Sequence, residues 1–182
     1  MNQPKRGRRV VILIGLCFAA PILISMLLAK LGWMPIGRKN YGELLSPPLP
    51  LGAVTLQDGA AFAWKTPPEW YWTLLVRVPA QCVGECRAHL DLIPNLRSAL
   101  ARNAIKLRIA VADPLPDGAR LTEEHGVYAL AQPVHASIEQ AMPRPSDDPQ
   151  LALVDPNGFV ILRYPQQANF TEVRKDLGKL LK

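Results

Sequence analysis

The sequence lacks the motifs that mark several common classes of enzyme. It has no glycine-rich phosphate-binding loop, no Gly-x-Ser-x-Gly elbow, and no cysteine or histidine array with the spacing of a zinc site. It also has no internal repeat, and only 3 of its 182 residues are cysteine. Hydrolase and nucleotide-binding functions therefore have no support in the sequence.

Acidic residues are absent from the first 33 positions, which hold five of the 21 basic residues. The rest of the chain carries sixteen basic against fifteen acidic residues and is nearly neutral. The net charge of +6 therefore comes from the N-terminal segment. It does not indicate a surface for nucleic acid, and we expect no nucleic-acid partner.

The basic residues at 1–9 precede an uncharged run, Val10–Ala29, of about twenty apolar or small residues. This is long enough to span a bilayer, and no small-x-small cleavage site follows it. We expect an uncleaved transmembrane helix over 10–32. The positive-inside rule keeps 1–9 in the cytoplasm and places the remainder in the periplasm of a bacterium, anchored to the inner membrane.

Prolines and glycines are concentrated directly after the apolar run. We expect residues 33–52 to form an extended tether with little regular structure. Residues 53–182 are long enough for one globular domain with its own core.

Alternating and apolar patterns predict seven elements in this domain, which together form an α/β fold with a central mixed sheet flanked by helices. They are a hairpin over Val54–Phe62, a central strand over Trp70–Val78, a helix over 86–102, a strand over Ile105–Val111, a helix near Val134–Met142, a hairpin over Leu151–Tyr164 and a helix over Phe170–Lys182. The segment 121–142 also has helical character interrupted by Gly126 and Pro133. Trp70 and Trp72 are expected to fill the core.

Two of the three cysteines, Cys82 and Cys86, stand where the central strand gives way to a helix. Backbone N–H groups at a helix N-terminus favour the thiolate, which attacks disulfides and binds soft metals. A structural disulfide is the alternative, but a link closing so few residues constrains the unfolded chain little. A Cu(I) ion and a reversible disulfide both suit such a pair. Cys17 lies in the apolar run and is expected to be a packing or lipid-facing residue.

The three histidines are weaker candidates. His89 follows Cys86 by three residues, so both project from one face of a continuous helix. It is either a third metal ligand, a group that holds a thiolate, or an ordinary polar residue on a half-exposed helix. His125 and His135 fall in the irregular middle segment, where nothing directs them to the cysteines.

The order of elements and the Cys82-x-x-x-Cys86 spacing resemble the membrane-anchored thioredoxin-like proteins of cytochrome c oxidase assembly, of which Sco-type copper chaperones are the best known. The resemblance covers about residues 33–182. The hairpin over Leu56–Phe62 and the Asp155–Gly158 turn before a terminal helix also carry it. It implies a thioredoxin-like domain.

In Sco proteins, two thiolates and a distant histidine bind copper. The corresponding stretch here, Pro145–Gln150, contains no histidine. Pro149 instead lies close to where thioredoxin-like redox enzymes place a cis-proline facing their dithiol. The departure removes the expected third ligand and leaves thiol redox chemistry untouched.

Three hypotheses follow. The first is an assembly factor for cytochrome c oxidase that either holds Cu(I) through Cys82 and Cys86 or keeps the copper-site cysteines of an oxidase subunit reduced. The second is a general periplasmic thiol–disulfide oxidoreductase, in which Cys82 is the more exposed thiol and attacks while Cys86 resolves the mixed disulfide. The third is a non-redox subunit of a membrane complex.

Overall fold

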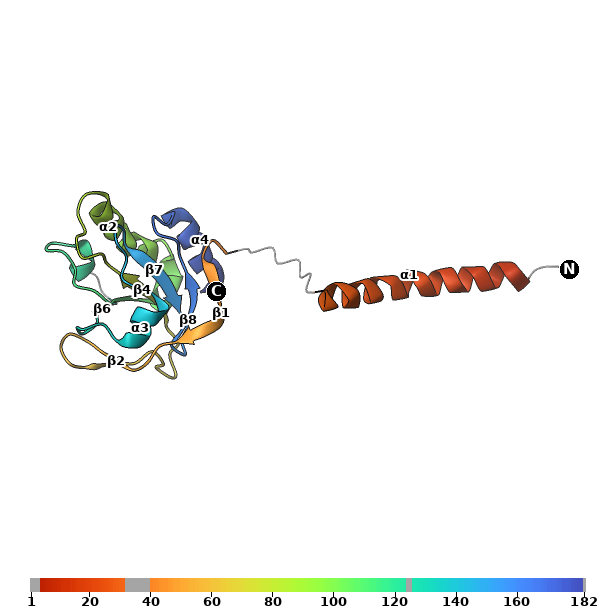
Figure 1. Cartoon of the computed structure of the whole chain (residues 1–182), viewed down its shortest axis with the longest axis horizontal. Helices are drawn as coiled ribbons and strands as arrows, with labels where there is room; N and C mark the ends of the chain where they lie inside the picture. Colours follow the sequence, from red (N-terminus) through yellow and green to blue (C-terminus); the bar gives the residue numbers. More distant parts are fainter. Residues whose placement is uncertain (1–3, 32–39, 124–125, 182) are drawn as a thin grey trace. The chain divides into compact units, whose positions relative to one another are not determined.

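The computed structural model describes residues 4–31, 40–123 and 126–181, and the chain divides into two compact units, residues 1–39 and 40–182 (Figure 1). The described part of the first unit is helix α1 (Pro4–Lys30). Its 21-residue segment Val10–Lys30 is long and apolar enough to cross a membrane. At a rise of 1.5 Å per residue, this segment is about as long as a bilayer core is thick. The expected apolar helix is therefore confirmed.

The second unit is built on a six-stranded sheet. Its spatial order is β1 (Glu43–Pro50), β8 (Phe159–Arg163), β7 (Gln150–Val154), β4 (Trp72–Arg77), β5 (Leu107–Val111) and β6 (Val127–Ala129). Strands β4, β5 and β6 run parallel, whereas β7 is antiparallel to β4, β8 to β7 and β1 to β8. The sheet is therefore mixed, as the sequence predicts.

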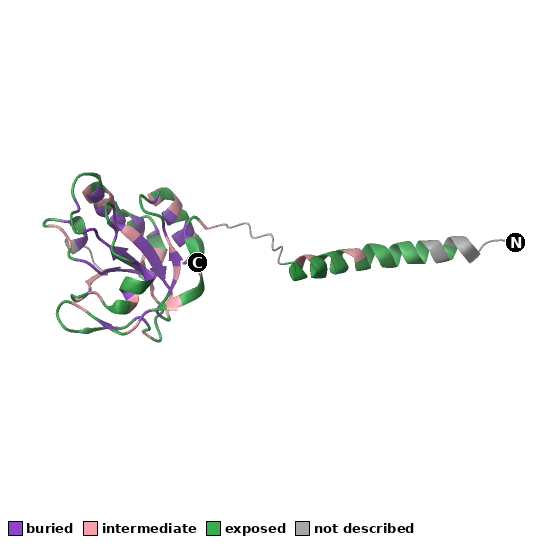
Figure 2. Cartoon of the chain, in the orientation of Figure 1, coloured by how far each residue is buried: buried purple, intermediate pink, exposed green. Residues whose placement is uncertain are grey.

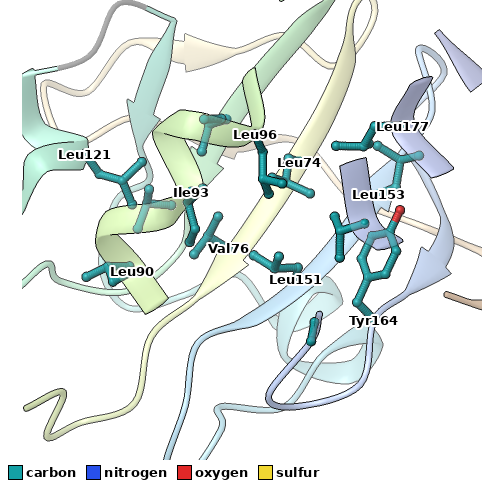
Figure 3. Packing of buried hydrophobic residues seen from close by; sticks show 14 of the residues in the cluster. Leu74, Val76, Leu90, Ile93, Leu96, Leu121, Leu151, Leu153, Tyr164 and Leu177 are labelled. Carbon is teal, nitrogen blue, oxygen red and sulfur yellow. The ribbon is translucent and has the colours of Figure 1, made fainter. Parts of the chain in front are cut away.

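Both faces of the sheet are covered, and the central strands β4 and β5 are buried apart from Trp72 at the start of β4 (Figure 2). One face packs against α2 (Glu85–Ser98) and α4 (Phe170–Leu180), and the other against α3 (Ala136–Ala141) and the small hairpin of β2 (Val54–Thr55) and β3 (Ala61–Phe62). Successive residues of a strand point to opposite faces. Leu74 accordingly packs in the α2 and α4 cluster (Figure 3), and Leu75 in the cluster that contains Ile138 of α3.

The expected tether over 33–52 is wrong in its second half. Residues Glu43–Pro50 form the edge strand β1, which pairs with β8 through a register shift between Leu44 and Leu49. Proline cannot donate to a strand ladder, but it is tolerated at an edge, where one side of the strand has no neighbour. The three prolines of β1 therefore suit an edge strand, and their density conceals it in the sequence.

Two helical predictions also need correction. The helix predicted over 86–102 ends at Ser98, and the 3-10 helix Ala101–Lys106 follows it, so β5 begins at Leu107 rather than at Ile105. Within the irregular segment 121–142, a 3-10 turn over Arg120–Glu123 precedes strand β6, and the helix is shorter than predicted. Short apolar runs do not distinguish helix from strand by periodicity alone.

Both predicted hairpins and the closing helix are confirmed. Gly59 and Gly158 have positive φ angles of 85° and 89° in the Asp-Gly and Pro-Asn-Gly turns. The Asp155 carboxylate accepts hydrogen bonds from the N–H groups of Asn157 and Phe159 at 2.9 and 2.8 Å. The Asn169 side chain caps α4 by accepting from the N–H of Thr171 at 3.0 Å.

Candidate redox site

Cys82 and Cys86 are joined by a disulfide, with their Cα atoms 5.2 Å apart. Strand β4 ends at Arg77 and α2 begins at Glu85, so Cys82 precedes the helix and Cys86 lies in its first turn. This is the placement that the sequence predicts. The bond is compatible with helix geometry because one of its two residues lies outside the helix.

Gly84, the N-cap of α2, fixes the turn between the two cysteines. Its φ of 59° lies in the left-handed region, where a side chain would be strained. Its position also carries no capping side chain. Backbone N–H groups at the start of α2 are thus not capped by Gly84, and their partial positive charge favours a thiolate at the neighbouring cysteines.

Both cysteines are buried. Cys82 is 6% and Cys86 4% exposed, and both belong to the core cluster on the α2 side of the sheet. Cys82 is the more exposed of the two, as expected, but only marginally, because both residues are buried. The pair nevertheless lies close beneath the surface, since the loop that separates the cysteines is exposed and Val83 within it is 77% exposed. Both cysteines therefore combine low solvent exposure with a position beside an exposed loop.

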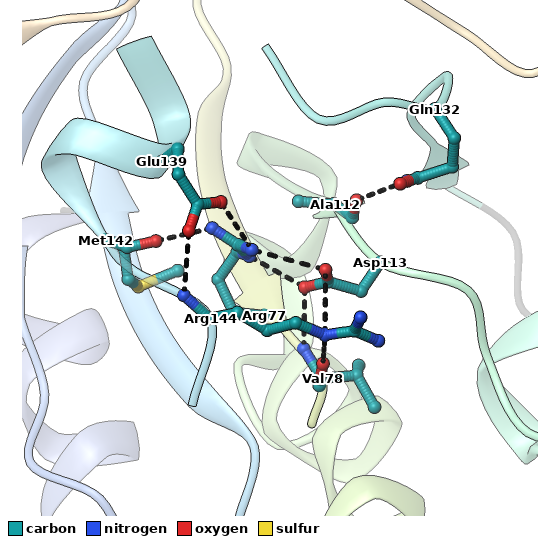
Figure 4. A network of polar contacts seen from close by, with 8 residues as sticks. All are labelled: Arg77, Val78, Ala112, Asp113, Gln132, Glu139, Met142 and Arg144. Carbon is teal, nitrogen blue, oxygen red and sulfur yellow. Dashed lines mark hydrogen bonds and ion pairs between the residues drawn. The ribbon is translucent and has the colours of Figure 1, made fainter. Parts of the chain in front are cut away.

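A buried ion pair lies at the end of β4 that leads into the dithiol loop (Figure 4). The Arg77 Nε donates to Asp113 Oδ2 at 2.7 Å, and the two side chains are 1% and 2% exposed. Arg77 also donates from Nη1 to the Met142 carbonyl at 2.5 Å and pairs through Nη2 with Glu139 at 2.8 Å. Each of the three guanidinium nitrogens thus has a partner, as a buried charge requires.

This network also binds the backbone of Val78, the residue that follows Arg77. The Val78 N–H donates to Asp113 Oδ2 at 3.0 Å, and the Val78 carbonyl accepts from Arg144 Nε at 3.1 Å. Arg144 Nε also lies 3.4 Å from Asp113 Oδ1. Both polar groups of Val78 are therefore fixed by side chains from two other segments, and the first residues of the dithiol loop leave the sheet from a rigid point.

Sequence reasoning did not identify the residues of this network. A signal for them exists, because Arg77 is the one charged residue of a largely apolar strand and Asp113 lies two residues after the end of the next strand, β5. A charge in a fully buried strand needs a partner, and adjacent parallel strands bring their carboxyl ends together.

His89 is held by Asp148. The His89 Nδ1–H donates to the Asp148 carboxylate, with distances of 2.8 and 3.0 Å to its two oxygens, and the His89 ring lies 6.0 Å from the ring of Phe170. The imidazole is 33% exposed, and the Asp148 side chain is 8% exposed. This arrangement links α2 to the segment before β7. It leaves Nε2 as the acceptor of the neutral ring.

Among the described residues, the remaining sequence candidates have roles or positions other than those expected. His135 caps α3, where its Nδ1 accepts from the Ser137 N–H at 3.2 Å, and His125 lies outside the described residues. Pro149, which the resemblance places near the position of a cis-proline, is buried, and the peptide bond that precedes it is not cis. Trp70 is 52% exposed and does not fill the core. In the described part of the chain, no three His, Cys, Asp or Glu side chains are grouped to hold a metal ion.

Comparisons with known proteins identify the family. The family model for a "transmembrane-like, thioredoxin-like, C-terminal domain" matches residues 72–182. Comparison with curated proteins gives no match.

Among solved structures, apo Sco1 from Thermus thermophilus is 17% identical, with a TM-score of 0.53 over 78% of this chain and 97% of that one. A domain of a possible thiol-disulfide isomerase from Cytophaga hutchinsonii is 18% identical, with a TM-score of 0.49 over 78% and 95%. Copper-bound ScoI from Bradyrhizobium japonicum is 19% identical, with a TM-score of 0.44 over 76% and 98%.

The similarity to apo Sco1 shows the thioredoxin-like fold that the order of elements predicts. At this level of identity it shows the fold alone. The family model spans the sheet from β4 onwards together with the dithiol and the closing helix. The chain therefore belongs to the transmembrane-like, thioredoxin-like C-terminal domain family.

Proposed function

We propose that the chain is a membrane-anchored thiol–disulfide exchange protein whose domain faces the periplasm. Its substrate is the disulfide of another protein, and the copper-site cysteines of a cytochrome c oxidase subunit are the substrate of this class that we favour. The observation that carries the proposal is the Cys82–Cys86 disulfide at the start of α2, directly after the central strand of a thioredoxin-like sheet.

Two physical arguments support reversible exchange over a structural role. The disulfide joins residues only four positions apart, so it removes little entropy from the unfolded chain and is a weak cross-link. The helix N-terminus, in turn, stabilises the thiolate that exchange requires. A purely structural disulfide would not need a helix N-terminus, because its sulfurs never have to form a thiolate.

The exchange step balances as follows. In the reduced domain, the Cys82 thiolate attacks one sulfur of the partner's disulfide, a mixed disulfide forms, and the partner's other sulfur leaves as a thiolate that takes a proton. The Cys86 thiolate then attacks the Cys82 sulfur and releases the partner's second thiol. Two electrons pass to the partner, the Cys82–Cys86 disulfide forms, and a dithiol reductant on the same side of the membrane restores the reduced pair.

Trapping tests this order of attack. In a Cys17→Ser background, Cys86→Ser is expected to accumulate a mixed disulfide with an oxidised peptide carrying a single disulfide, because Cys82 attacks and nothing resolves the product. The matched variant Cys82→Ser is expected to accumulate much less. Equal trapping by both variants, or trapping by neither, contradicts the proposal.

Cu(I) handling is the second candidate, and one observation favours it. A metal-binding histidine usually donates its other ring N–H to a carboxylate, as His89 does to Asp148. Once the disulfide is reduced, two thiolates supply the soft ligands that Cu(I) prefers. His89 is not grouped with them in the described, oxidised structure, so its Nε2 would serve as the nitrogen ligand only after the side chains rearrange on reduction. The Asp148 carboxylate itself is too hard a ligand for this role.

Titration of the reduced chain with Cu(I) in competition with a chelator separates the two candidates. Copper handling predicts one tightly bound ion, lost in Cys82→Ser and weakened in His89→Gln, whereas His135→Gln serves as the control. Absence of tight binding, together with trapping by Cys86→Ser, supports exchange alone.

A further inference from the structure

The end of the sheet remote from the dithiol carries an apolar hollow of about 490 Å³. Its lining consists of aromatic, aliphatic and charged side chains: Glu69, Trp70, Tyr71, Trp72, Ile105, Lys106 and Leu181. Ile105 is 73% and Trp70 52% exposed, so two large apolar side chains of the lining face the solvent. Large apolar side chains gathered at one exposed site indicate an interaction surface.

Basic side chains border this hollow. A neighbouring hollow of about 650 Å³ is lined by Arg102, Asn103, Lys106 and Gly178, and Lys106 is common to both. On the other side, the Lys65 ammonium lies 5.6 Å from the centre of the Trp70 ring. The single acidic side chain in either lining, Glu69, accepts a hydrogen bond from the Tyr71 hydroxyl. The lining of the hollow therefore carries one basic and one acidic side chain, and the neighbouring Lys65 and Arg102 give the surface around it a net positive charge.

The chain length between the two units limits how far Asn40, the first residue of the domain, can be from the end of the candidate membrane segment. The candidate membrane segment ends at Lys30 and the domain begins at Asn40. Ten residues span at most about 35 Å even when fully extended. If Val10–Lys30 spans a bilayer, as we propose, the domain is tethered to that bilayer, and the effective concentration of lipid is high enough for weak contacts to be populated.

We propose that this surface, formed by Trp70, Tyr71, Ile105, Lys65, Arg102 and Lys106, docks on a bilayer that contains anionic phospholipid. Tryptophan and tyrosine collect at the membrane interface, where one part of the ring is apolar and the other polar. Lysine and arginine at the border bind the anionic headgroups. The six-residue strand β4 begins at the hollow and ends beside the dithiol loop, roughly 20 Å away. Docking therefore turns the dithiol away from the lipid and towards the aqueous phase.

Depth-dependent quenching in nanodiscs tests the proposal on the full chain. An environment-sensitive fluorophore is attached to Ile105→Cys in a Cys17→Ser background, without reductant, so that the Cys82–Cys86 disulfide stays closed. The matched control carries the same fluorophore on Leu92→Cys, a residue of α2 that is 41% exposed. In nanodiscs with phosphatidylglycerol, brominated lipid is expected to quench the Ile105 probe at least about twofold more than the Leu92 probe.

Charge reversal provides the second arm. Arg102→Glu is expected to remove most of the excess quenching, as does replacement of phosphatidylglycerol by phosphatidylcholine, whereas Arg174→Glu on the exposed side of α4 leaves it unchanged. Equal quenching of the two probes overturns the proposal and assigns the hollow to a protein or small-molecule ligand. The proposal is also overturned if the excess quenching is the same with either lipid and is not reduced by Arg102→Glu. Neither result depends on the redox chemistry of the cysteines, so this proposal and the proposed function fail independently.

Discussion

Arg77 and Asp113 form an ion pair in the interior, at the carboxyl ends of the adjacent parallel strands β4 and β5, with Nε and Oδ2 2.7 Å apart. The same carboxylate accepts the N–H of Val78, the first residue beyond β4. The buried Asp113 carboxylate thus pairs with the Arg77 guanidinium, which Glu139 also contacts, and fixes the start of the segment that carries the dithiol.

Replacing Asp113 by alanine is expected to lower the free energy of unfolding by about 3–5 kcal/mol, because Arg77 would remain buried without its principal partner. Chemical denaturation followed by tryptophan fluorescence measures the loss. The exposed pair of Glu172 and Lys175 on α4 serves as the control. Glu172→Gln is expected to cost less than about 1 kcal/mol, since an exposed pair gains little from its charges. Similar losses in the two variants would contradict the assigned role of Asp113.

The buried hydroxyl of Tyr164, in contrast to the Asp113 carboxylate, is expected to contribute nothing to stability. The residue is 1% exposed, and its hydroxyl oxygen has no hydrogen-bond partner among the described residues. Tyr164→Phe removes this unpaired polar group and is expected to leave the free energy of unfolding at neutral pH unchanged or raised by up to about 1 kcal/mol. A loss larger than about 1 kcal/mol would show that the hydroxyl is bonded after all.

The same variant predicts a pH dependence. Burial, and to a smaller extent the Asp176 carboxylate, raise the pKa of Tyr164 above its ordinary value of 10.0. Above about pH 10, the unfolded chain therefore releases a proton that the folded chain keeps, so this tyrosine destabilises the fold by up to about 1.4 kcal/mol per pH unit. Phenylalanine lacks this effect. The stability advantage of Tyr164→Phe over the parent chain is expected to grow as pH rises from 9 to about 11, and a constant difference would contradict the assignment.

Arg108 is held by aromatic rings instead of a carboxylate. Its guanidinium carbon lies 4.7 Å from the Phe62 ring centre and 5.2 Å from that of Tyr71, and Nη2 donates to the Trp64 carbonyl at 3.1 Å. Arg108→Lys loses the flat stacking surface and is expected to cost about 1–2 kcal/mol of unfolding free energy. Arg102→Lys, at an exposed position, is expected to stay within about 0.5 kcal/mol of the parent chain.

Reduction of the Cys82–Cys86 bond is expected to lower the free energy of unfolding only slightly. The separation of four residues corresponds to a loop-closure contribution of about 2 kcal/mol, well below the loss expected for Asp113→Ala. Denaturation of the chain with and without a phosphine reductant measures the difference. Unfolding of the domain on reduction alone would instead identify the bond as a structural cross-link.

The order of the elements could be predicted from sequence because each central element carries a local pattern. The apolar strand before Cys82, the amphipathic helix after it and the Pro-Asn-Gly hairpin each depend on residues close together in the chain. The position of the dithiol followed from the same local patterns. These features need no knowledge of the tertiary contacts.

The rest could not be predicted because it depends on partners distant in sequence. Strand β1 forms only because β8, more than a hundred residues later, offers an unpaired edge, with Glu43 opposite Arg163. The Arg77–Asp113 pair depends on the register of two strands, and the burial of Cys82 depends on the core that closes over it. His89 was considered for its spacing to Cys86, whereas its partner, Asp148, is 59 residues away.

The reduction potential of the Cys82–Cys86 pair tests the central claim most directly. It is measured by equilibrating the chain with glutathione buffers, alkylating the free thiols and counting the modified cysteines by mass spectrometry, with Cys17→Ser as the background. Reversible exchange predicts a potential between about −270 and −120 mV, the range of catalytic dithiols. A potential below about −300 mV, or a pair that the glutathione buffers do not reduce, would identify a structural disulfide and contradict the account.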